Sequence, residues 1–230
     1  PDRLYAEQLS GTAFTVPRDR NMRSWLYRIR PSVQHSQNAR CPAAFAPRFQ
    51  SDFTDDATSV TTPDQLRWMP LEVPDRAAHG ACHFVQGLHS TGGTGEPASG
   101  EGLAIHNYVA NCSMDDCAFT NADGDFLIVP QQGALTVRTE FGVMHVAPKE
   151  ICVVQRGMRF SVGVDGPSRG YVLELFGHNH FQLPDLGPIG SNGLANPQDF
   201  LHPVAAYEDR EDIAYTMLTK FGGKLFQCQQ

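Results

Sequence analysis

The stretch Met158-Arg159-Phe160-Ser161-Val162-Gly163-Val164 decides the fold class, because apolar side chains recur at every second position. Successive side chains of a β-strand point to opposite faces, so this alternation predicts a strand with one face buried. The same period recurs in Ala134–Glu140 and in Gly170–Phe176. In the latter stretch the apolar set is Tyr171, Leu173 and Leu175, which we expect to share one face.

Three further stretches outside these segments read as strands. They are Leu103–Ala110, Asp125–Val129 and Ile151–Gln155, and the last two are almost continuously apolar, which is typical of central strands. The 21 glycines and 16 prolines among 230 residues punctuate the whole chain. Many short strands separated by such turn residues predict an all-β protein: a β-sandwich or cupin-like jelly roll with long loops and few short helices.

The first hundred residues are less regular. Asp2–Ser10 is compatible with a short helix and Trp25–Ile29 with a strand, whereas Ser36–Pro63 is polar and predicts a long loop. Thr91–Gly102 predicts a second, glycine-rich loop. That stretch contains no lysine, so it is not a phosphate-binding P-loop.

Composition excludes several classes of protein. The formal net charge is −7 and no basic stripe is present, which argues against nucleic-acid and anionic-membrane binding. No apolar run approaches the ~18–20 residues that cross a bilayer. The chain is large for a disulfide-stapled scaffold, so its six cysteines favour reduced thiols in the cytoplasm. The pair Cys112 and Cys117 lacks the further ligands of a structural zinc site.

Two blocks resemble the metal-binding cupins. Asp123–Gly133 resembles one cupin strand and Pro148–Arg159 a later one. Cupins carry His-x-His before the first block, where this chain has Cys117–Asn121, and a late histidine where it has Arg159. A guanidinium offers no lone pair to a metal, so we expect this barrel to hold no iron.

Other candidate residues remain open. His178 and His180 would share a face in an extended segment and form a metal site with a carboxylate such as Glu174, whereas His79 and His83 would meet only on a helix. His106 is expected to be a buried, hydrogen-bonded histidine. Ser191 lies in a glycine-rich run but lacks the surroundings of a catalytic serine.

Five blocks in order closely resemble the homogentisate 1,2-dioxygenase family, and the resemblance runs from about Leu4 to Phe226. The blocks are Leu4–Thr15, Arg23–Ile29, Asp123–Pro130, Gln155–Phe160 and Leu183–Phe200. The resemblance implies a cytoplasmic Fe(II) enzyme that cleaves homogentisate with O2 to 4-maleylacetoacetate in tyrosine and phenylalanine breakdown. It also implies a homo-oligomer, a hexamer built as a dimer of trimers.

The resemblance further implies that this chain is the family's N-terminal β-sandwich domain. We expect it to be irregular over 1–100, cupin-like over about 101–180, and to hold a docking loop and the start of a linker over about 181–230. From the missing initiator methionine and the strand-like end at Gln230, we expect the chain to be a fragment. The iron ligands are expected beyond Gln230, so no catalytic, substrate-binding or metal residue is assigned here.

Two alternatives stay open beside the enzyme. One is a non-catalytic cupin-like binding module, and the other is a separate metal site at His178 and His180. We also expect the surface that meets the catalytic half to be apolar, which would make the isolated chain prone to aggregation.

Overall fold

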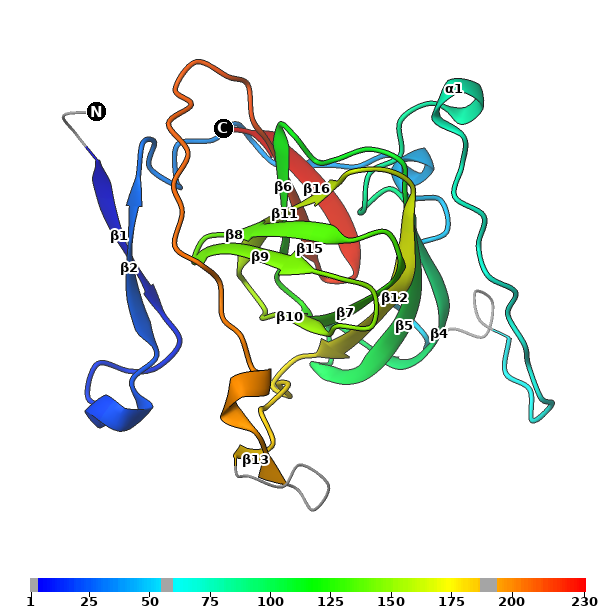
Figure 1. The fold of residues 1–230 in the computed structure, drawn as a ribbon, viewed down its shortest axis with the longest axis horizontal. Coiled ribbons are helices and arrows are strands. Elements are labelled where there is room, and N and C mark those ends of the chain that lie inside the picture. Colours follow the sequence, from blue (N-terminus) through cyan, green and yellow to red (C-terminus); the bar gives the residue numbers. More distant parts are fainter. Residues whose placement is uncertain (1–3, 55–59, 187–193) are drawn as a thin grey trace.

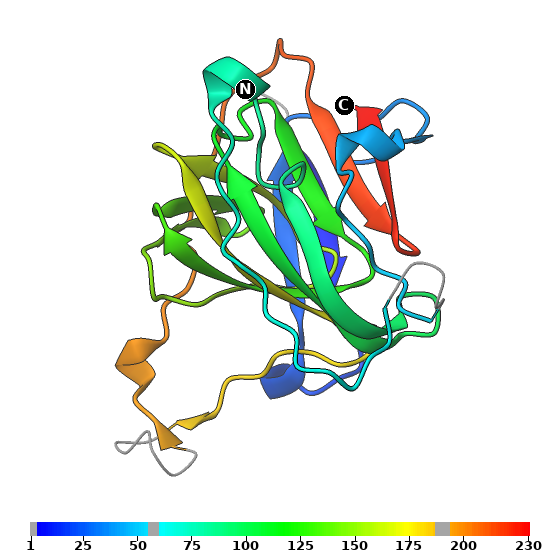
Figure 2. The same cartoon turned by 90° about the vertical axis from the view of Figure 1, so that its right-hand side faces the viewer.

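The computed structural model describes residues 4–54, 60–186 and 194–230, and this part of the chain is built mainly of strands (Figures 1 and 2). A sandwich of two antiparallel-rich sheets forms its body. The five-stranded sheet has the order β10 (Cys152–Val154), β7 (Gly124–Gln132), β12 (Ser168–Phe176), β5 (Glu101–Ala110) and β4 (Leu88–Glu96). The all-β prediction is confirmed.

The seven-stranded sheet combines β3 from the N-terminal part of the chain with the two C-terminal strands and four strands from its middle. Its order is β3 (Ala39–Arg40), β16 (Lys224–Gln229), β15 (Thr216–Phe221), β6 (Cys117–Asn121), β11 (Arg159–Val164), β8 (Leu135–Thr139) and β9 (Gly142–Val146). β15 pairs parallel to β6, and β16 pairs antiparallel to β15. The sandwich therefore draws on strands from outside residues 101–180.

Aromatic side chains join the two sheets at the centre of the core. Phe119 of β6 stacks on Phe126 of β7 with ring centroids 5.9 Å apart, and Phe160 of β11 meets Phe119 edge-on at 5.7 Å. All three side chains are buried. Such pairs add to the free energy of burial, so this cluster fixes how the sheets face each other.

Most of the predicted strands are confirmed, but the position of one is corrected. Ile151–Gln155 contains β10, which lies at the edge of its sheet and not at its centre. Its apolar residues face the core through Cys152 and Val154, while Ile151 is exposed. The apolar run of this strand therefore does not come from a central position in the sheet. It arises because both faces of this edge strand carry apolar side chains.

The predicted helix over Asp2–Ser10 is wrong in the described part, because Tyr5–Ser10 forms strand β1. β1 pairs antiparallel with β2 (Arg23–Arg28), and together they make a hairpin that stands apart from the sandwich (Figure 1). The partner residues of this pairing lie between 13 and 23 positions away in the sequence. Local helix propensity is weak, and such non-local pairing overrides it.

The predicted loop Thr91–Gly102 is also wrong, because β4 and β5 run through it and pair with each other. Its glycines permit close backbone approach. A Cβ at Gly95 would lie 2.3 Å from the carbonyl oxygen of Glu101, and Gly95 has a φ of +74°. Glycine inside a strand marks such close contacts, and here it was misread as a loop signal.

Irregular segments and short helices connect these strands. Ser36–Pro63 is mostly loop in its described part, apart from β3 and the short helix Ala43–Phe45. The helix α1 is a single turn over Arg76–His79, and the carboxylate of Asp75 caps it by accepting from the backbone N–H of Ala77. Beyond β12 the chain projects away from the sandwich to β13 (Asp185–Leu186), β14 (Leu194–Ala195) and the turn Pro197–Asp199 (Figure 2).

The alternation of β12 is confirmed, but the side chains that face the core are not those of the predicted apolar set. Val172, Glu174 and Phe176 are fully buried between the sheets. Tyr171, Leu173 and Leu175 are half-buried and lie on the outer face. This strand therefore places a carboxylate inside the sandwich and apolar side chains outside it.

Candidate functional site

The centre of the sandwich holds a lysine between two carboxylates. The Nζ of Lys220 on β15 lies 2.6 Å from Oε1 of Glu174 on β12 and 2.7 Å from Oδ2 of Asp123. The side chains of Lys220 and Glu174 are fully buried, and that of Asp123 is 5% exposed. Charges buried this deeply persist only when they are paired and hydrogen-bonded.

The remaining polar atoms of this cluster are also paired. Oε2 of Glu174 lies 3.1 Å from Nε2 of His106, and the side-chain amide of Asn121 donates to Oε1 at 2.7 Å. Asp123 accepts the backbone N–H groups of Gly222 and Gly223, which form the turn between β15 and β16. Each carboxylate thus has its hydrogen-bonding capacity largely filled by this chain.

Electrostatics keeps Glu174 ionised. Burial by itself raises the pKa of this carboxyl, but the Lys220 ammonium and the His106 ring together hold the pKa below its ordinary value. An ionised glutamate whose oxygens are already engaged has no open position for a substrate or a metal. The cluster therefore has a structural role: its ion pairs link the β15–β16 hairpin to the five-stranded sheet.

Two residues of this cluster, His106 and Lys220, differ in how far the sequence predicts their roles. The expectation that His106 is buried and hydrogen-bonded is confirmed, since its Nδ1 lies 2.8 Å from Oγ of Ser90. Lys220 was missed. The available signal was a lone lysine within the apolar strand around Met217 and Leu218, but its partners could not be found from spacing.

The predicted alternative metal site at His178 and His180 does not assemble around Glu174. Glu174 points into the sandwich, whereas His180 pairs on the other side of the sheet with Asp125, Nδ1 to Oδ2 at 3.1 Å. The buried Asp125 also accepts the backbone N–H groups of Arg156 and Phe181. His178 is exposed. The contact between His180 and Asp125 holds the segment that follows β12 against the sheet.

The other histidine pair is separated by a helix end. α1 stops at His79, and Gly80 continues with a φ of +82°, so His83 is not on the same helical face. Burial lowers the pKa of His83 to about 4, which keeps this ring neutral at pH 7. The pair therefore offers no shared ligand face.

The remaining candidates also lack the chemistry of a site. All six cysteines are free thiols, and burial, with smaller contributions from Asp116 and Cys112, raises the pKa of Cys117 to about 11. Ser191 lies outside the described residues. In the ranges that the structure covers, no three His, Cys, Asp or Glu side chains are grouped as metal ligands. The residues present here do not fit an iron centre.

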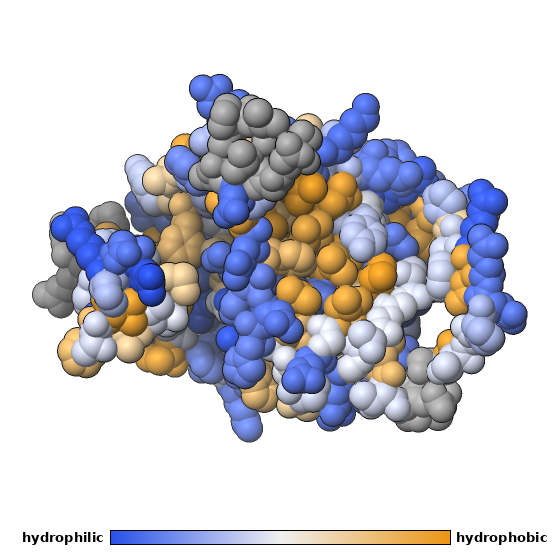
Figure 3. Space-filling model, turned by 90° about the horizontal axis from the view of Figure 1, so that it is seen from below, coloured by the Kyte–Doolittle hydropathy of each residue, from blue (hydrophilic) through white to orange (hydrophobic). Residues whose placement is uncertain are grey.

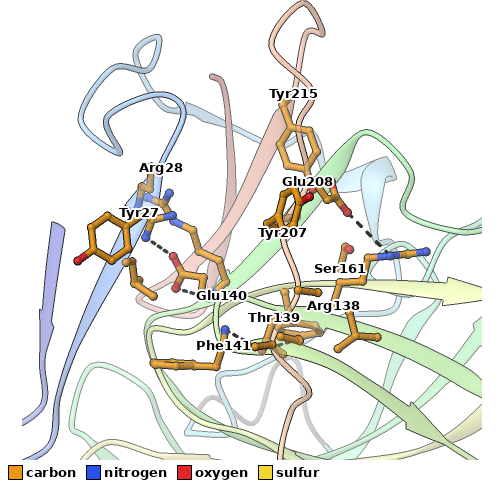
Figure 4. Close-up of a pocket in the computed structure, with 18 of the residues that line it drawn as sticks. Tyr27, Arg28, Arg138, Thr139, Glu140, Phe141, Ser161, Tyr207, Glu208 and Tyr215 are labelled. Atoms are coloured by element: carbon orange, nitrogen blue, oxygen red, sulfur yellow. Dashed lines mark hydrogen bonds and ion pairs between the residues drawn. The ribbon is translucent and has the colours of Figure 1, made fainter. Parts of the chain in front are cut away.

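A groove of about 610 Å³ separates the β1–β2 hairpin from the seven-stranded sheet (Figure 4). Arg28 of β2 reaches across it and pairs with Glu140, and its Nε lies 2.7 Å from Oε2 of Glu7. Arg159, at the position of the missing cupin histidine, donates its backbone N–H to Glu140. Arg28 thus bridges Glu7 of the hairpin and Glu140 between β8 and β9, and this contact holds the hairpin against the seven-stranded sheet.

Fold and site together define a class: an all-β sandwich of two sheets with an internal ion-pair cluster at its centre. The family can be stated more closely. The model described as "Homogentisate 1,2-dioxygenase N-terminal" matches residues 1–230. The chain belongs to the homogentisate 1,2-dioxygenase family.

Curated relatives agree with this membership. Proteins named homogentisate 1,2-dioxygenase are 53% identical in Drosophila melanogaster, 55% in Mus musculus and 54% in Homo sapiens. Each match covers 100% of this chain but 51%, 50% and 50% of the relative, respectively. The chain thus spans about half the length of these relatives.

Solved structures give only distant likenesses. A Klebsiella pneumoniae protein with a double-stranded β-helix domain matches with a TM-score of 0.37 and 12% identity, covering 54% of this chain and 97% of that one. A cupin superfamily protein from Desulfitobacterium hafniense matches with a TM-score of 0.34 and 14% identity, covering 49% and 99%. Among the described residues, no helix is long and apolar enough to span a membrane.

Proposed function

We propose that these 230 residues form the non-catalytic half of a homogentisate 1,2-dioxygenase, which uses O2 to cleave the ring of homogentisate to 4-maleylacetoacetate. The observation that carries this proposal is the family match, which covers the entire chain and about half of each relative. The part of the relatives that the match leaves uncovered is where we place Fe(II), its ligands and the reacting groups.

The internal cluster supports a scaffold role for this half. Lys220 occupies the acidic centre of the sandwich, where its ammonium is bonded to Glu174 and Asp123. A cation with three donors and no acceptor cannot coordinate a metal or remove a proton while it is held in this way. We assign to this centre the task of keeping the two sheets and the C-terminal hairpin in one arrangement.

The wider proposal follows the family. It includes a cytoplasmic protein that assembles as a hexamer, a dimer of trimers, with no nucleic-acid or membrane partner. It also includes a division of this half into an irregular N-terminal part, a cupin-like body and a C-terminal segment, 181–230, that leads towards the catalytic half.

Oxygen uptake with homogentisate, Fe(II) and ascorbate tests the proposal, on protein whose intact mass has been confirmed. We expect uptake by the full-length gene product that contains these residues and none by the 230-residue chain. Uptake at the short mass would place the iron site within these residues and overturn the proposal.

Metal analysis of the same samples separates the alternatives. Stoichiometric iron or zinc in the 230-residue chain, abolished by His180→Ala, would support the separate metal site. Binding of homogentisate by the short chain without turnover, together with a full-length product that shows no uptake, would favour the binding module.

A further inference from the structure

The outer face of the five-stranded sheet is apolar. The side chains that form this outer apolar face share outward positions on four neighbouring strands: Leu103, Ile105, Leu127, Val129, Val153, Tyr171, Leu173 and Leu175. Figure 3 shows hydrophobic residues gathered on the side seen from below, where β7, β12 and β5 lie in Figure 1. Ile151, two residues before Val153, is 65% exposed and extends the surface past the edge strand.

Strand register makes this surface continuous. Leu173 lies directly opposite Leu127 on one side and Ile105 on the other, and Val153 lies opposite Leu127. Residues directly opposite one another on neighbouring strands lie on the same face with their Cβ atoms in contact range. One row of four aliphatic side chains therefore crosses four strands.

This face lies outside the hydrophobic core of the described residues. None of its eight side chains belongs to the core clusters or packs against them. A sheet that is apolar on both faces is typical of a sheet buried on both sides, whereas a sheet with one face in water alternates between apolar and polar. Contiguous apolar surface of this kind marks an interaction site.

A cationic cleft continues the outer apolar face at one end. The segment Trp68–Leu71 stands over Val129 and Tyr171 and leaves a cleft of about 620 Å³. Lys149 and Arg169 line the cleft, and no aspartate or glutamate does. The Nη1 of Arg169 donates to the carbonyl oxygen of Leu71, and its buried Nε has no hydrogen-bond partner among the described residues.

We infer that the other half of the family's chain packs on the outer apolar face and its cationic cleft. That half presents an apolar surface bordered by a carboxylate that faces Lys149 and Arg169. This inference rests on the proposed function and names the surface that performs it.

Two observations favour this occupant over a second copy of the same face. About half of each relative lies outside the matched region, so a protein mass similar to this one is available to pack on these residues. A symmetric dimer would bring the face against itself. The eight side chains of the outer apolar face and the lining of the cleft include no carboxylate, and Asp125 on the same side of the sheet is already paired with His180, so Lys149 and Arg169 would have no partner.

Photo-crosslinking in the full-length gene product tests the inference. A photoreactive phenylalanine analogue replaces Leu173, and mass spectrometry identifies the linked peptide. We expect a peptide from outside residues 1–230 of the same chain. A peptide from residues 1–230 of a second copy, or no link above that of the control at the exposed Val33, would overturn the inference.

Paired charge variants give a second readout. Leu173→Glu should lower the Tm of the full-length product by about 5 °C or more, because it buries a charge at the contact. Val33→Glu, at an exposed position, should leave the Tm of the full-length product unchanged. Equal Tm shifts for the two variants would overturn the inference.

The outcomes separate this inference from the proposed function. Wild-type full-length product without homogentisate-dependent oxygen uptake would remove the proposed function whatever the crosslinks show. Uptake together with a crosslink to a second copy would support the proposed function and overturn the inferred packing of the other half on this face.

Discussion

The Nζ of Lys220 and Oε1 of Glu174 lie 2.6 Å apart in the centre of the sandwich, with both side chains fully excluded from solvent. These residues are 46 positions apart in sequence and belong to different sheets. Their pairing joins the β15–β16 hairpin to β12. It explains why the C-terminal strands are part of the sandwich and do not trail away from it.

Lys220→Met should destabilise the protein by about 3–5 kcal/mol, because it leaves Glu174 and Asp123 buried without their cation. The free energy of unfolding in urea measures this loss. Lys224→Met is the matched control, since Lys224 is exposed in the same hairpin and should change stability by less than about 0.5 kcal/mol. Equal effects of the two variants would contradict the role of the cluster.

Stability should fall as the pH drops from 6.5 towards 4, because the half-buried His83 is neutral in the folded chain and its pKa is lowered from 6.5 to about 4. Between these values the unfolded chain binds a proton that the folded chain does not, so protonation favours unfolding. At pH 5 the loss is about 2 kcal/mol relative to pH 7. In His83→Gln this part of the pH dependence should vanish in denaturant titrations, and an unchanged profile would contradict the assignment.

Gly177→Ala should destabilise the protein by about 2–3 kcal/mol or more. Gly177 has a φ of +72°, and a Cβ there would lie 1.8 Å from the carbonyl oxygen of Gly100. Gly166 has open space around its Cβ position, so Gly166→Ala should stay within about 0.5 kcal/mol of the parent. Thermal melting of the two variants, side by side, checks the contrast.

Glu140→Gln should loosen the N-terminal hairpin without unfolding the sandwich. The pair that joins Arg28 to Glu140 bridges the groove, and an isolated two-stranded hairpin is marginal in water. We expect amide hydrogen exchange in Tyr5–Ser10 to rise about tenfold, with protection of β7 unchanged. Asp19→Asn, in an exposed ion pair, should leave both regions as they are. Faster exchange in β7 as well would show that the hairpin is part of the global fold.

Much of the strand pattern could be predicted, and the failures have physical causes. Period-2 alternation located β8, β11 and β12 within a few residues, because burial of one sheet face imposes that period. Glycine-rich Thr91–Gly102 was misread, since the sequence does not distinguish a glycine that frees a loop from one that lets two strands approach. Tyr5–Ser10 was misread because its partner strand lies beyond a long connection.

The candidate site was harder to predict than the strands. His106 could be placed in a buried environment from its apolar neighbours, but nothing in its spacing pointed to Glu174, which is 68 residues away. Lys220 was missed for the same reason, since its contact with Asp123 spans 97 positions. Pairing across such distances depends on how the two sheets stack.

The sequence by itself determined the all-β class, most of the strand positions and the family, because local alternation and ordered motifs are properties of the linear chain. The tertiary structure decided which face of each strand is inside. The alternation in β12 shows that the strand has two different faces, but it does not show which face is buried. Lys220 from the opposite sheet pairs with Glu174, so Glu174 is buried and Leu173 lies outside. A buried charge is stable only beside its partner, and only the folded chain brings that partner into place.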